Sequence, residues 1–182
     1  MRDSLDKAAE AVRSGGVIVY PTESVFGLGC DPFNESAVMN LLEIKKRSVD
    51  KGLILIASHV QQVLPYIQPQ QPEDLANALQ TWPGFHTWVF PKSNLVPYWL
   101  SGQFQTLAVR VSSHPTVKQL CDMLGHGLVS TSANVSNEDV LGSISEIKKL
   151  FGDKIDAYID APLGGAEKPS QIKDAHTLKS YR

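Results

Sequence analysis

The chain has 182 residues, of which 42% are hydrophobic, and its 17 basic and 19 acidic residues give a formal net charge of −2. This length predicts about one domain with a sizeable core. The near-neutral charge excludes a generically basic nucleic-acid coat, and the spread of apolar residues excludes a disordered chain. No apolar run approaches the roughly 20 residues that span a bilayer, and Cys30 and Cys121 belong to no CxxC motif. We therefore expect one cytoplasmic domain, residues 1–182, with no membrane partner.

Helical and strand patterns alternate along the chain. The expected helices, in chain order, lie at residues 5–12, 35–47, 59–67, 73–81, 115–124 and 144–151. The expected strands lie at residues 17–20, 53–56, 86–90, 105–112, 128–129 and 157–160. Asp3 or Ser4, Asn34 and Ser143 are candidate helix caps, and Gly125 is a candidate stop. This alternation predicts an α/β domain in which one twisted mixed sheet carries helices on its faces.

The densest positive charge lies at the end of the second expected helix, in the run Lys45-Lys46-Arg47 followed by Lys51. Such a run is typical of an ordinary helix C-terminus, where Glu43 and Arg47 are four residues apart and can pair. It is equally typical of an anion site, because Arg offers a fork and Lys a point charge to phosphate oxygens. The local sequence leaves both interpretations open.

Hydroxyl groups follow an apolar strand in the segment Ser130-Thr131-Ser132-Ala133-Asn134. Ligands of α/β sheets collect beyond the carboxyl ends of strands, and this segment offers hydroxyl and backbone N–H donors to a phosphate. A simple turn, in which Ser and Asn bond their own backbone, explains the same residues. Arg110 likewise lies beside small residues of its strand, where it is either solvated or a ligand for a carboxylate or phosphate.

The common catalytic and nucleotide-binding motifs are absent. The chain has no GxSxG, no GxxxxGK[ST] and no spacing typical of metal ligands, and the glycines after Pro21-Thr22-Glu23-Ser24 do not form GxGxxG. A nucleotide would therefore bind without the usual phosphate loop, and a substrate would have to bring its own nucleophile.

Taken together, the ordered segments resemble the YrdC family, the threonylcarbamoyl-AMP synthases that act in tRNA modification, in its short bacterial form. The matching segments span nearly the whole chain: residues 20–32, 45–47, 51–53, 82–84, 107–111, 114–115 and 130–134. The resemblance implies that L-threonine, bicarbonate or CO2, and ATP react to threonylcarbamoyl-AMP and pyrophosphate. It also implies downstream proteins that transfer the threonylcarbamoyl group to tRNA. Threonine's amine would supply the missing nucleophile, by capturing CO2 as a carbamate that attacks the α-phosphate.

The resemblance also implies site residues. The family's KxR and SxN signatures correspond to Lys45, Arg47, Ser132 and Asn134, which would surround the phosphates of ATP with Mg2+ balancing the charge. Lys45 and Arg47 would be the catalytic residues. The secondary ATP-binding candidates are Lys51, Thr106 and Ser130, and the threonine-binding candidates are Thr22, Arg110 and Ser170. Arg110 would be the partner of threonine's carboxylate.

Four positions depart from the family pattern: Ser48, Phe85, Asn137 and Gln171. None removes a charged signature residue, so the expected activity stands, while the role of Ser170 and the last loop is less well supported. An RNA-binding or ribosome-maturation factor, which would hold tRNA or double-stranded RNA in the same cationic concavity, is the alternative function.

Overall fold

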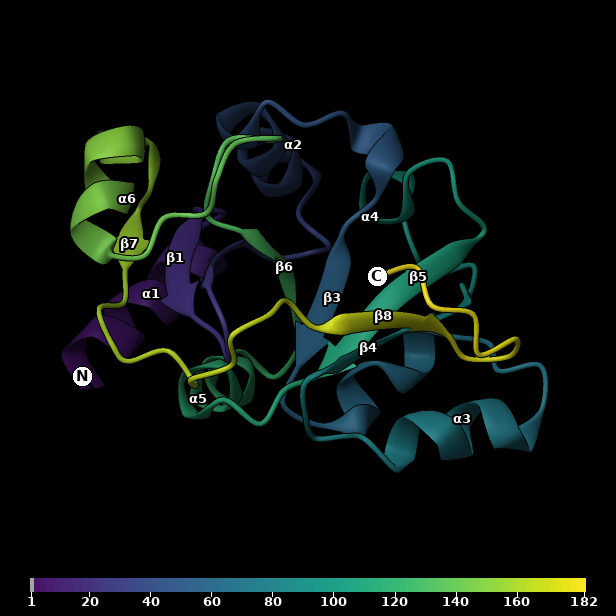
Figure 1. Cartoon of the computed structure of the whole chain (residues 1–182). Helices are drawn as coiled ribbons and strands as arrows, with labels where there is room; N and C mark the ends of the chain where they lie inside the picture. Colours follow the sequence, from purple (N-terminus) through teal and green to yellow (C-terminus); the bar gives the residue numbers. More distant parts are fainter. Residues whose placement is uncertain (1) are drawn as a thin grey trace.

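Eight strands form one mixed sheet in the computed structural model, which describes residues 2–182 (Figure 1). The strands are β1 (Ile18–Pro21), β2 (Phe26–Gly29), β3 (Ile54–Ala57), β4 (His86–Pro91), β5 (Thr106–Val111), β6 (Leu128–Ser132), β7 (Ala157–Tyr158) and β8 (Gln171–Asp174). They lie in the order β7-β1-β2-β6-β3-β5-β4-β8. The pairs β1–β7, β3–β5 and β4–β8 are parallel and the others are antiparallel, which confirms the predicted mixed α/β sheet.

Helices lie on both faces of this sheet (Figure 1). The α-helices are α1 (Arg2–Arg13), α2 (Glu35–Lys45), α3 (Pro72–Leu79), α4 (Tyr98–Ser101), α5 (Pro115–Leu124) and α6 (Ile144–Phe151). The 3-10 helices are η1 (Val49–Lys51), η2 (Val60–Gln62), η3 (Leu64–Tyr66) and η4 (Gly152–Lys154). No α-helix among residues 2–182 is long and apolar enough to cross a membrane.

The alternation of side chains along the strands divides the core into two parts. Ile18 and Tyr20 of β1 pack with α1 and α5, whereas Val19 belongs to the larger core that contains apolar residues of α2, α3, α4 and α6. In the same way, Ile56 of β3 packs with the first group and Leu55 with the second. Successive residues of a strand point to opposite faces, so β1, β3 and β6 contribute to both parts of the core.

Local signals placed several helix ends correctly. Asn34 caps α2 by accepting a hydrogen bond from the Ala37 backbone N–H at 3.1 Å, and Ser143 caps α6. Gly125 takes a left-handed conformation, with φ of 78°, at the end of α5. These caps confirm the predicted helix ends. The sequence could predict them because each cap is made by residues within one turn of the helix.

Other boundaries differ from the sequence prediction. Residues 59–67 form the two short 3-10 helices η2 and η3 instead of one helix, because Pro65 cannot donate the backbone hydrogen bond that a continuing helix needs. Helix α1 includes Arg2, so Asp3 and Ser4 lie inside its first turn and are not its cap. The run Lys45-Lys46-Arg47 is helical only as far as Lys45. Strands β2 and β8 and helix α4 were not predicted.

Candidate functional site

A cavity of about 710 Å³ opens where the ends of β2, β5 and β6 meet the loops after β1 and before β8. All the site residues predicted from the sequence line this cavity except Lys45 and Asn134. The predicted residues that line it are Thr22, Arg47, Lys51, Thr106, Arg110, Ser130, Ser132 and Ser170. The fold therefore gathers residues from five segments of the chain into one place.

Strand register explains how the hydroxyl and arginine side chains come together. Ser130 of β6 pairs with Ile54 of β3, which in turn pairs with Ala108 of β5. Thr106 and Arg110 lie two residues before and after Ala108, so they share its face of the strand. The cavity thus has a floor of small and polar residues across β6, β3 and β5, as the alternation in residues 105–112 predicted.

Lys45 lies beneath the cavity and holds the segment that follows β6. Its ammonium donates to the backbone oxygens of Ser132 at 2.6 Å and Asn134 at 2.8 Å, and to Asn134 Oδ1 at 2.9 Å. The Ser132 hydroxyl donates to the same Oδ1 at 2.6 Å. Burial and, to a smaller extent, the neighbouring Arg47 charge together lower the pKa of Lys45 to about 8. Lys45 and Asn134 therefore do not line the cavity themselves but position Ser132, which does.

Arg47 lies just past the end of α2 and reaches the cavity directly. Its Nη2 donates to the backbone oxygen of Gly52 at 3.0 Å, which holds the guanidinium against η1. Its Nε–H is buried and has no hydrogen-bond partner within residues 2–182. No ion pair joins Arg47 to Glu43 in this part of the chain, so the structure does not support the helix-end pairing.

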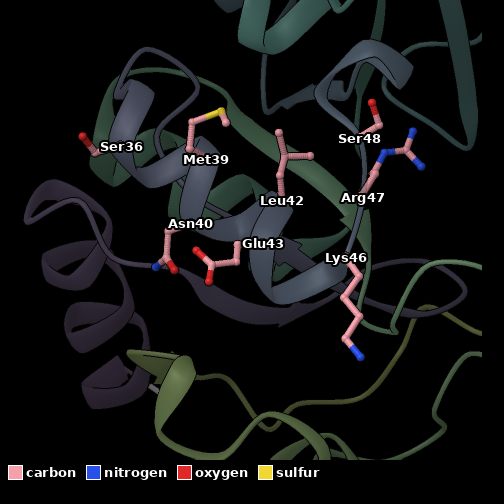
Figure 2. Close-up of a pocket in the computed structure, with 8 residues that line it drawn as sticks. All are labelled: Ser36, Met39, Asn40, Leu42, Glu43, Lys46, Arg47 and Ser48. Atoms are coloured by element: carbon pink, nitrogen blue, oxygen red, sulfur yellow. The ribbon is translucent and has the colours of Figure 1, made fainter.

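Lys46 and Arg47 take different directions although they are neighbours. Figure 2 shows their side chains leaving the end of α2 in different directions. Both residues border a second hollow of about 700 Å³. Lys46 is exposed and its backbone is left-handed, with φ of 50°. This second hollow lies over the exposed residues of α2, and of the predicted site residues only Arg47 borders it. Arg47 therefore borders both the main cavity and the second hollow.

Arg110 forms a buried ion pair with Glu23, a residue that the sequence did not single out as a site residue. Arg110 Nε also donates to the Gly84 backbone oxygen at 3.3 Å, and its guanidinium lies 4.7 Å from the centre of the Phe85 ring. Glu23 Oε1 accepts hydrogen bonds from the Ser112 hydroxyl at 2.8 Å and the Ser113 N–H at 3.3 Å. The charge of Arg110 is therefore already balanced within the protein.

Thr22 and Ser170 face the cavity from two loops that contact each other. The Thr22 hydroxyl donates to the Val25 backbone oxygen at 2.7 Å. The backbone oxygen of Thr22 accepts a hydrogen bond from the Gly164 backbone N–H at 3.0 Å. The Ser170 hydroxyl lies 3.0 Å from the hydroxyl of Thr87. The Gly- and Pro-containing loop before β8 is thus fastened to the turn after β1, which closes this end of the cavity.

The sequence missed Arg182, whose side chain also lines the cavity. Arg182 Nε donates to the Ser170 backbone oxygen at 3.2 Å. Arg182 is 72 residues from Arg110 in sequence, and only the pairing of β8 and the following segment brings it here. No local pattern could have found it.

Among residues 2–182, the cavity lining contains no cysteine, histidine, aspartate or glutamate. No group of three or more His, Cys, Asp or Glu side chains among residues 2–182 could hold a metal ion. Cys30 and Cys121 are both buried in the core, and burial raises the pKa of each thiol. The cavity offers cations, hydroxyl groups and backbone atoms, which suit the binding of anions.

The comparisons with known proteins agree on one family. The Sua5–YciO–YrdC family model, described as "Telomere recombination", matches residues 10–182. Threonylcarbamoyl-AMP synthase of Coxiella burnetii (strain RSA 493 / Nine Mile phase I) is 48% identical over 179 residues, which cover 98% of this chain and 96% of that protein. Threonylcarbamoyl-AMP synthase of Pseudoalteromonas translucida (strain TAC 125) is 49% identical over 183 residues, covering 100% of this chain and 98% of that protein.

Solved structures agree with the fold. Sua5 of P. abyssi in complex with L-threonine superposes with a TM-score of 0.86 and 30% identity, and the match covers 97% of this chain and 52% of that one. The chain thus spans about half the length of that Sua5. YciO of E. coli superposes with a TM-score of 0.81 and 25% identity, covering 96% of this chain and 84% of that one.

Proposed function

The chain belongs to the Sua5–YciO–YrdC family, and from this membership we infer that it is a threonylcarbamoyl-AMP synthase. The enzyme joins L-threonine, bicarbonate or CO2, and ATP, and releases threonylcarbamoyl-AMP and pyrophosphate. The observation that carries this function is the near full-length identity of 48–49% to proteins of that name. The chemistry of the cavity supports it, because anions of phosphate and carboxylate type fit a site lined by arginine and hydroxyl groups.

In the proposed reaction the nucleophile belongs to the substrates. Threonine's nitrogen bonds to the carbon of CO2 and loses a proton, which gives a carbamate. A carbamate oxygen then bonds to the α-phosphorus of ATP, and the bond from that phosphorus to the bridging oxygen of pyrophosphate breaks. The protein positions the reactants and stabilises the negative charge that develops, which are large contributions in phosphoryl-transfer chemistry.

We propose that ATP occupies the side of the cavity nearest α2. Arg47 would bind phosphate oxygens through its guanidinium, and Ser132 through its hydroxyl at the end of β6, because both residues line the cavity. Lys45 and Asn134 would keep the Ser132 segment in place, and the Lys45 ammonium would add positive charge next to it. The flanking candidates for ATP are Lys51, Thr106 and Ser130, which line the same cavity.

We propose that threonine occupies the opposite side, between the two loops that carry Thr22 and Ser170. Arg110 lies on this side and orients the site through its pair with Glu23. Sua5 of P. abyssi, which shares this fold over 97% of the present chain, is known as a complex with L-threonine. Two anionic substrates would thus meet over the floor formed by β6, β3 and β5.

Mg2+ is proposed as part of the ATP substrate. The cavity lining contains hydroxyl groups but no Asp or Glu. Mg2+ commonly keeps several waters and is held in large part by substrate phosphates, so this lining is compatible with it. When bound, the ion would neutralise phosphate charge, while Arg47 and Ser132 fix the position of the phosphates.

Three further properties are proposals of the same kind. The domain is the whole chain, because both parts of the core share one sheet. The reaction takes place in the cytoplasm, where downstream proteins transfer the product's threonylcarbamoyl group to tRNA. Direct binding of tRNA or double-stranded RNA is secondary, supported by two exposed lysines, Lys51 at the cavity and Lys46 at the second hollow. It should appear as affinity that falls steeply with salt.

The decisive experiment is incubation with ATP, L-threonine, bicarbonate and Mg2+, followed by mass spectrometry. We expect threonylcarbamoyl-AMP and pyrophosphate, both dependent on threonine. If neither forms while an active relative makes both, the proposed activity is wrong. Salt-sensitive RNA binding without ATP consumption would then favour the RNA-binding alternative.

A further inference from the structure

The loop between α2 and β3 carries two of the cations that line the cavity. We call residues 46–52 the cationic loop, of which Arg47 and Lys51 border the cavity. Arg47 is tied to the loop itself, because its Nη2 donates to the backbone oxygen of Gly52 at 3.0 Å. None of the three residues of η1, which forms the middle of the loop, is fully buried. The position of the cationic loop therefore depends largely on a neighbouring element.

That neighbour is α4 with the two residues that follow it. Figure 1 shows α4 beside the segment that joins α2 to β3. The Leu53 N–H donates to the Leu100 oxygen at 2.9 Å, and the Gln103 N–H donates to the Asp50 oxygen at 3.2 Å. Gly102 has φ of 61°, and a Cβ atom at this position would overlap the Asp50 oxygen, so the two backbones touch here. This close contact fixes the backbone of Asp50 and leaves only its side chain free to turn.

The Asp50 carboxylate is the only negatively charged side chain of the cationic loop. The Tyr98 hydroxyl of α4 donates to Asp50 Oδ1 at 2.5 Å, and the Ser48 hydroxyl donates to Asp50 Oδ2 at 3.2 Å. None of the ion pairs among residues 2–182 includes Asp50, although Arg47 and Lys51 are its near neighbours in sequence. Neutral hydroxyl groups therefore hold this carboxylate, and Tyr98 is the one that comes from outside the loop.

A released Asp50 carboxylate would compete with an anionic substrate. The proposed function assigns the charges of Arg47 and Lys51 to the phosphates of ATP. A carboxylate that pairs with either cation cancels much of the field that attracts phosphate, and ATP would have to displace it before binding. The Tyr98 hydroxyl opposes this pairing without adding a charge of its own.

We propose that Tyr98 is a positioning residue for the ATP side of the cavity. Its hydroxyl holds the Asp50 carboxylate and thereby keeps Arg47 and Lys51 available to phosphate. This inference rests on the proposed function and adds to it a residue that lies outside the cavity lining. Tyr98 and Asp50 are both exposed, so water screens their interaction and the expected effect is moderate.

The test is the variant Tyr98→Phe, which removes the hydroxyl and keeps the ring. Binding of ATP with Mg2+, and separately of L-threonine, is measured by calorimetry on the full chain at low and at raised salt. Tyr158→Phe is the matched control, because it removes an exposed hydroxyl that donates to the Gly152 oxygen at 2.8 Å, outside the cavity lining. Thermal unfolding of each variant checks that the fold is intact.

We expect Tyr98→Phe to weaken ATP binding about three- to tenfold, the loss of one exposed hydrogen bond to a charged group. Steady-state kinetics should show a rise in KM for ATP of the same size, while kcat and KM for L-threonine change by less than about twofold. The loss should shrink at raised salt, because salt screens the competing ion pair. Tyr158→Phe should bind both ligands as the wild type does.

An Asp50→Asn background separates the electrostatic effect from a change of shape. Asn has nearly the shape of Asp but no charge that could pair with Arg47 or Lys51. In this background Tyr98→Phe should change the Kd for ATP by less than about twofold, because the two effects are coupled. A loss of the full size in this background would show that the hydroxyl acts through packing, and would overturn the inference.

Different failures have different meanings. If the wild type makes threonylcarbamoyl-AMP but Tyr98→Phe binds ATP normally, this inference is wrong and the proposed function stands. An equal loss of ATP and L-threonine binding would also overturn it, since that indicates a general disturbance of the cavity. If the wild type binds ATP without forming product, while Tyr98→Phe weakens ATP binding as expected, the proposed function fails and the role of Tyr98 stands. If the wild type binds no ATP, both fail.

Discussion

The buried cations of the cavity are held in two different ways. Lys45 is satisfied by neutral oxygens of Ser132 and Asn134, whereas Arg110 is satisfied by the carboxylate of Glu23. A cation among neutral acceptors keeps its positive field, while an ion pair nearly cancels it. Lys45 therefore keeps a positive field next to Ser132, whereas the charge of Arg110 is largely balanced by Glu23.

Replacing Arg47 tests the phosphate assignment. We expect Arg47→Ala to lower kcat/KM for ATP by a free-energy equivalent of roughly 1–3 kcal/mol, because a charged hydrogen bond to phosphate is lost. Lys46→Asn is the matched control: it removes a neighbouring charge, and Asn tolerates the left-handed backbone at that position. Steady-state kinetics with varied ATP provides the measurement. Equal kinetics for Arg47→Ala and the wild type would assign the basic run to a simple helix end.

The lowered pKa of Lys45 predicts two opposite responses to alkaline pH. The folded protein loses the Lys45 proton at about pH 8, whereas the unfolded chain keeps it until about 10.5. Between these values the unfolded state binds more protons, so this group makes the free energy of unfolding rise with pH. Over the same range kcat/KM for ATP should fall, because the positive charge beneath Ser132 is lost.

A pH series of kinetics and urea unfolding measures both responses. Threonine's amine also loses its proton near this range, but that change raises the rate and does not mimic the predicted fall. The variant Lys45→Met should flatten both profiles. A wild-type rate that does not decline above pH 8 would contradict the assignment of this charge to ATP.

The Glu23–Arg110 pair predicts a large stability effect. Glu23→Gln leaves the buried guanidinium without its counter-charge, which should cost about 3–5 kcal/mol in the free energy of unfolding. Glu43→Gln, an exposed carboxylate of α2, should change it by no more than about 0.5 kcal/mol. The double variant Glu23→Gln with Arg110→Met should recover part of the loss in urea unfolding. A small effect of Glu23→Gln alone would show that the pair is solvated.

At the scale of elements, helix ends were predictable and short strands were not. Asn34, Ser143 and Gly125 act within one turn, so their signals survive in the sequence. Strands β2 and β8 have four residues each, and their sequences, FGLG and QIKD, carry no strand pattern. They are strands because neighbouring strands offer them hydrogen bonds, a tertiary influence that overrides local propensity.

The cap of α6 gives a prediction about an element away from the cavity. The Ser143 hydroxyl accepts from the Glu146 N–H at 3.3 Å and donates to the Glu146 carboxylate at 2.8 Å. Ser143→Ala should lower the free energy of unfolding by about 1 kcal/mol, or about 2–4 °C in Tm, and leave kcat/KM unchanged. The exposed Ser145→Ala serves as control, with a smaller effect. A change in kcat/KM without a change in Tm would imply that α6 contributes to function.

At the scale of the whole molecule, one sheet connects the two sides of the cavity. The proposed ATP side lies by the end of α2 and β6, and the proposed threonine side lies by β5 and the loops before β2 and β8. The strands between them, β3 and β6, are paired to each other and have buried residues on both faces. Ligand binding at this position should therefore stabilise the protein as a unit.

Thermal unfolding measures that stabilisation. At about 100 times Kd, a ligand that binds only the folded state adds roughly 2.7 kcal/mol, equivalent to roughly 5–10 °C for a chain of this size. We expect ATP with Mg2+ to raise Tm in this way, and threonine to add a further increase. In Arg47→Ala the shift with ATP should shrink at the same ligand concentration, while Lys46→Asn should keep it. No shift in the wild type at millimolar ligand would contradict the site.

The sequence by itself determined the α/β class, several helix ends, and eight of the residues that line the cavity, though not Arg182. These rest on local periodicity, on capping within one turn, and on ordered motifs whose residues can be read directly. Only the tertiary structure decided that Lys45 reaches Ser132 from below, that Glu23 neutralises Arg110, and that Arg182 faces Ser170. The physical reason is separation: Lys45 and Ser132 are 87 residues apart, and a contact of that range is set by strand order and register. The net charge of −2 was compatible with many partners, and the fold is what brings four cations to one cavity.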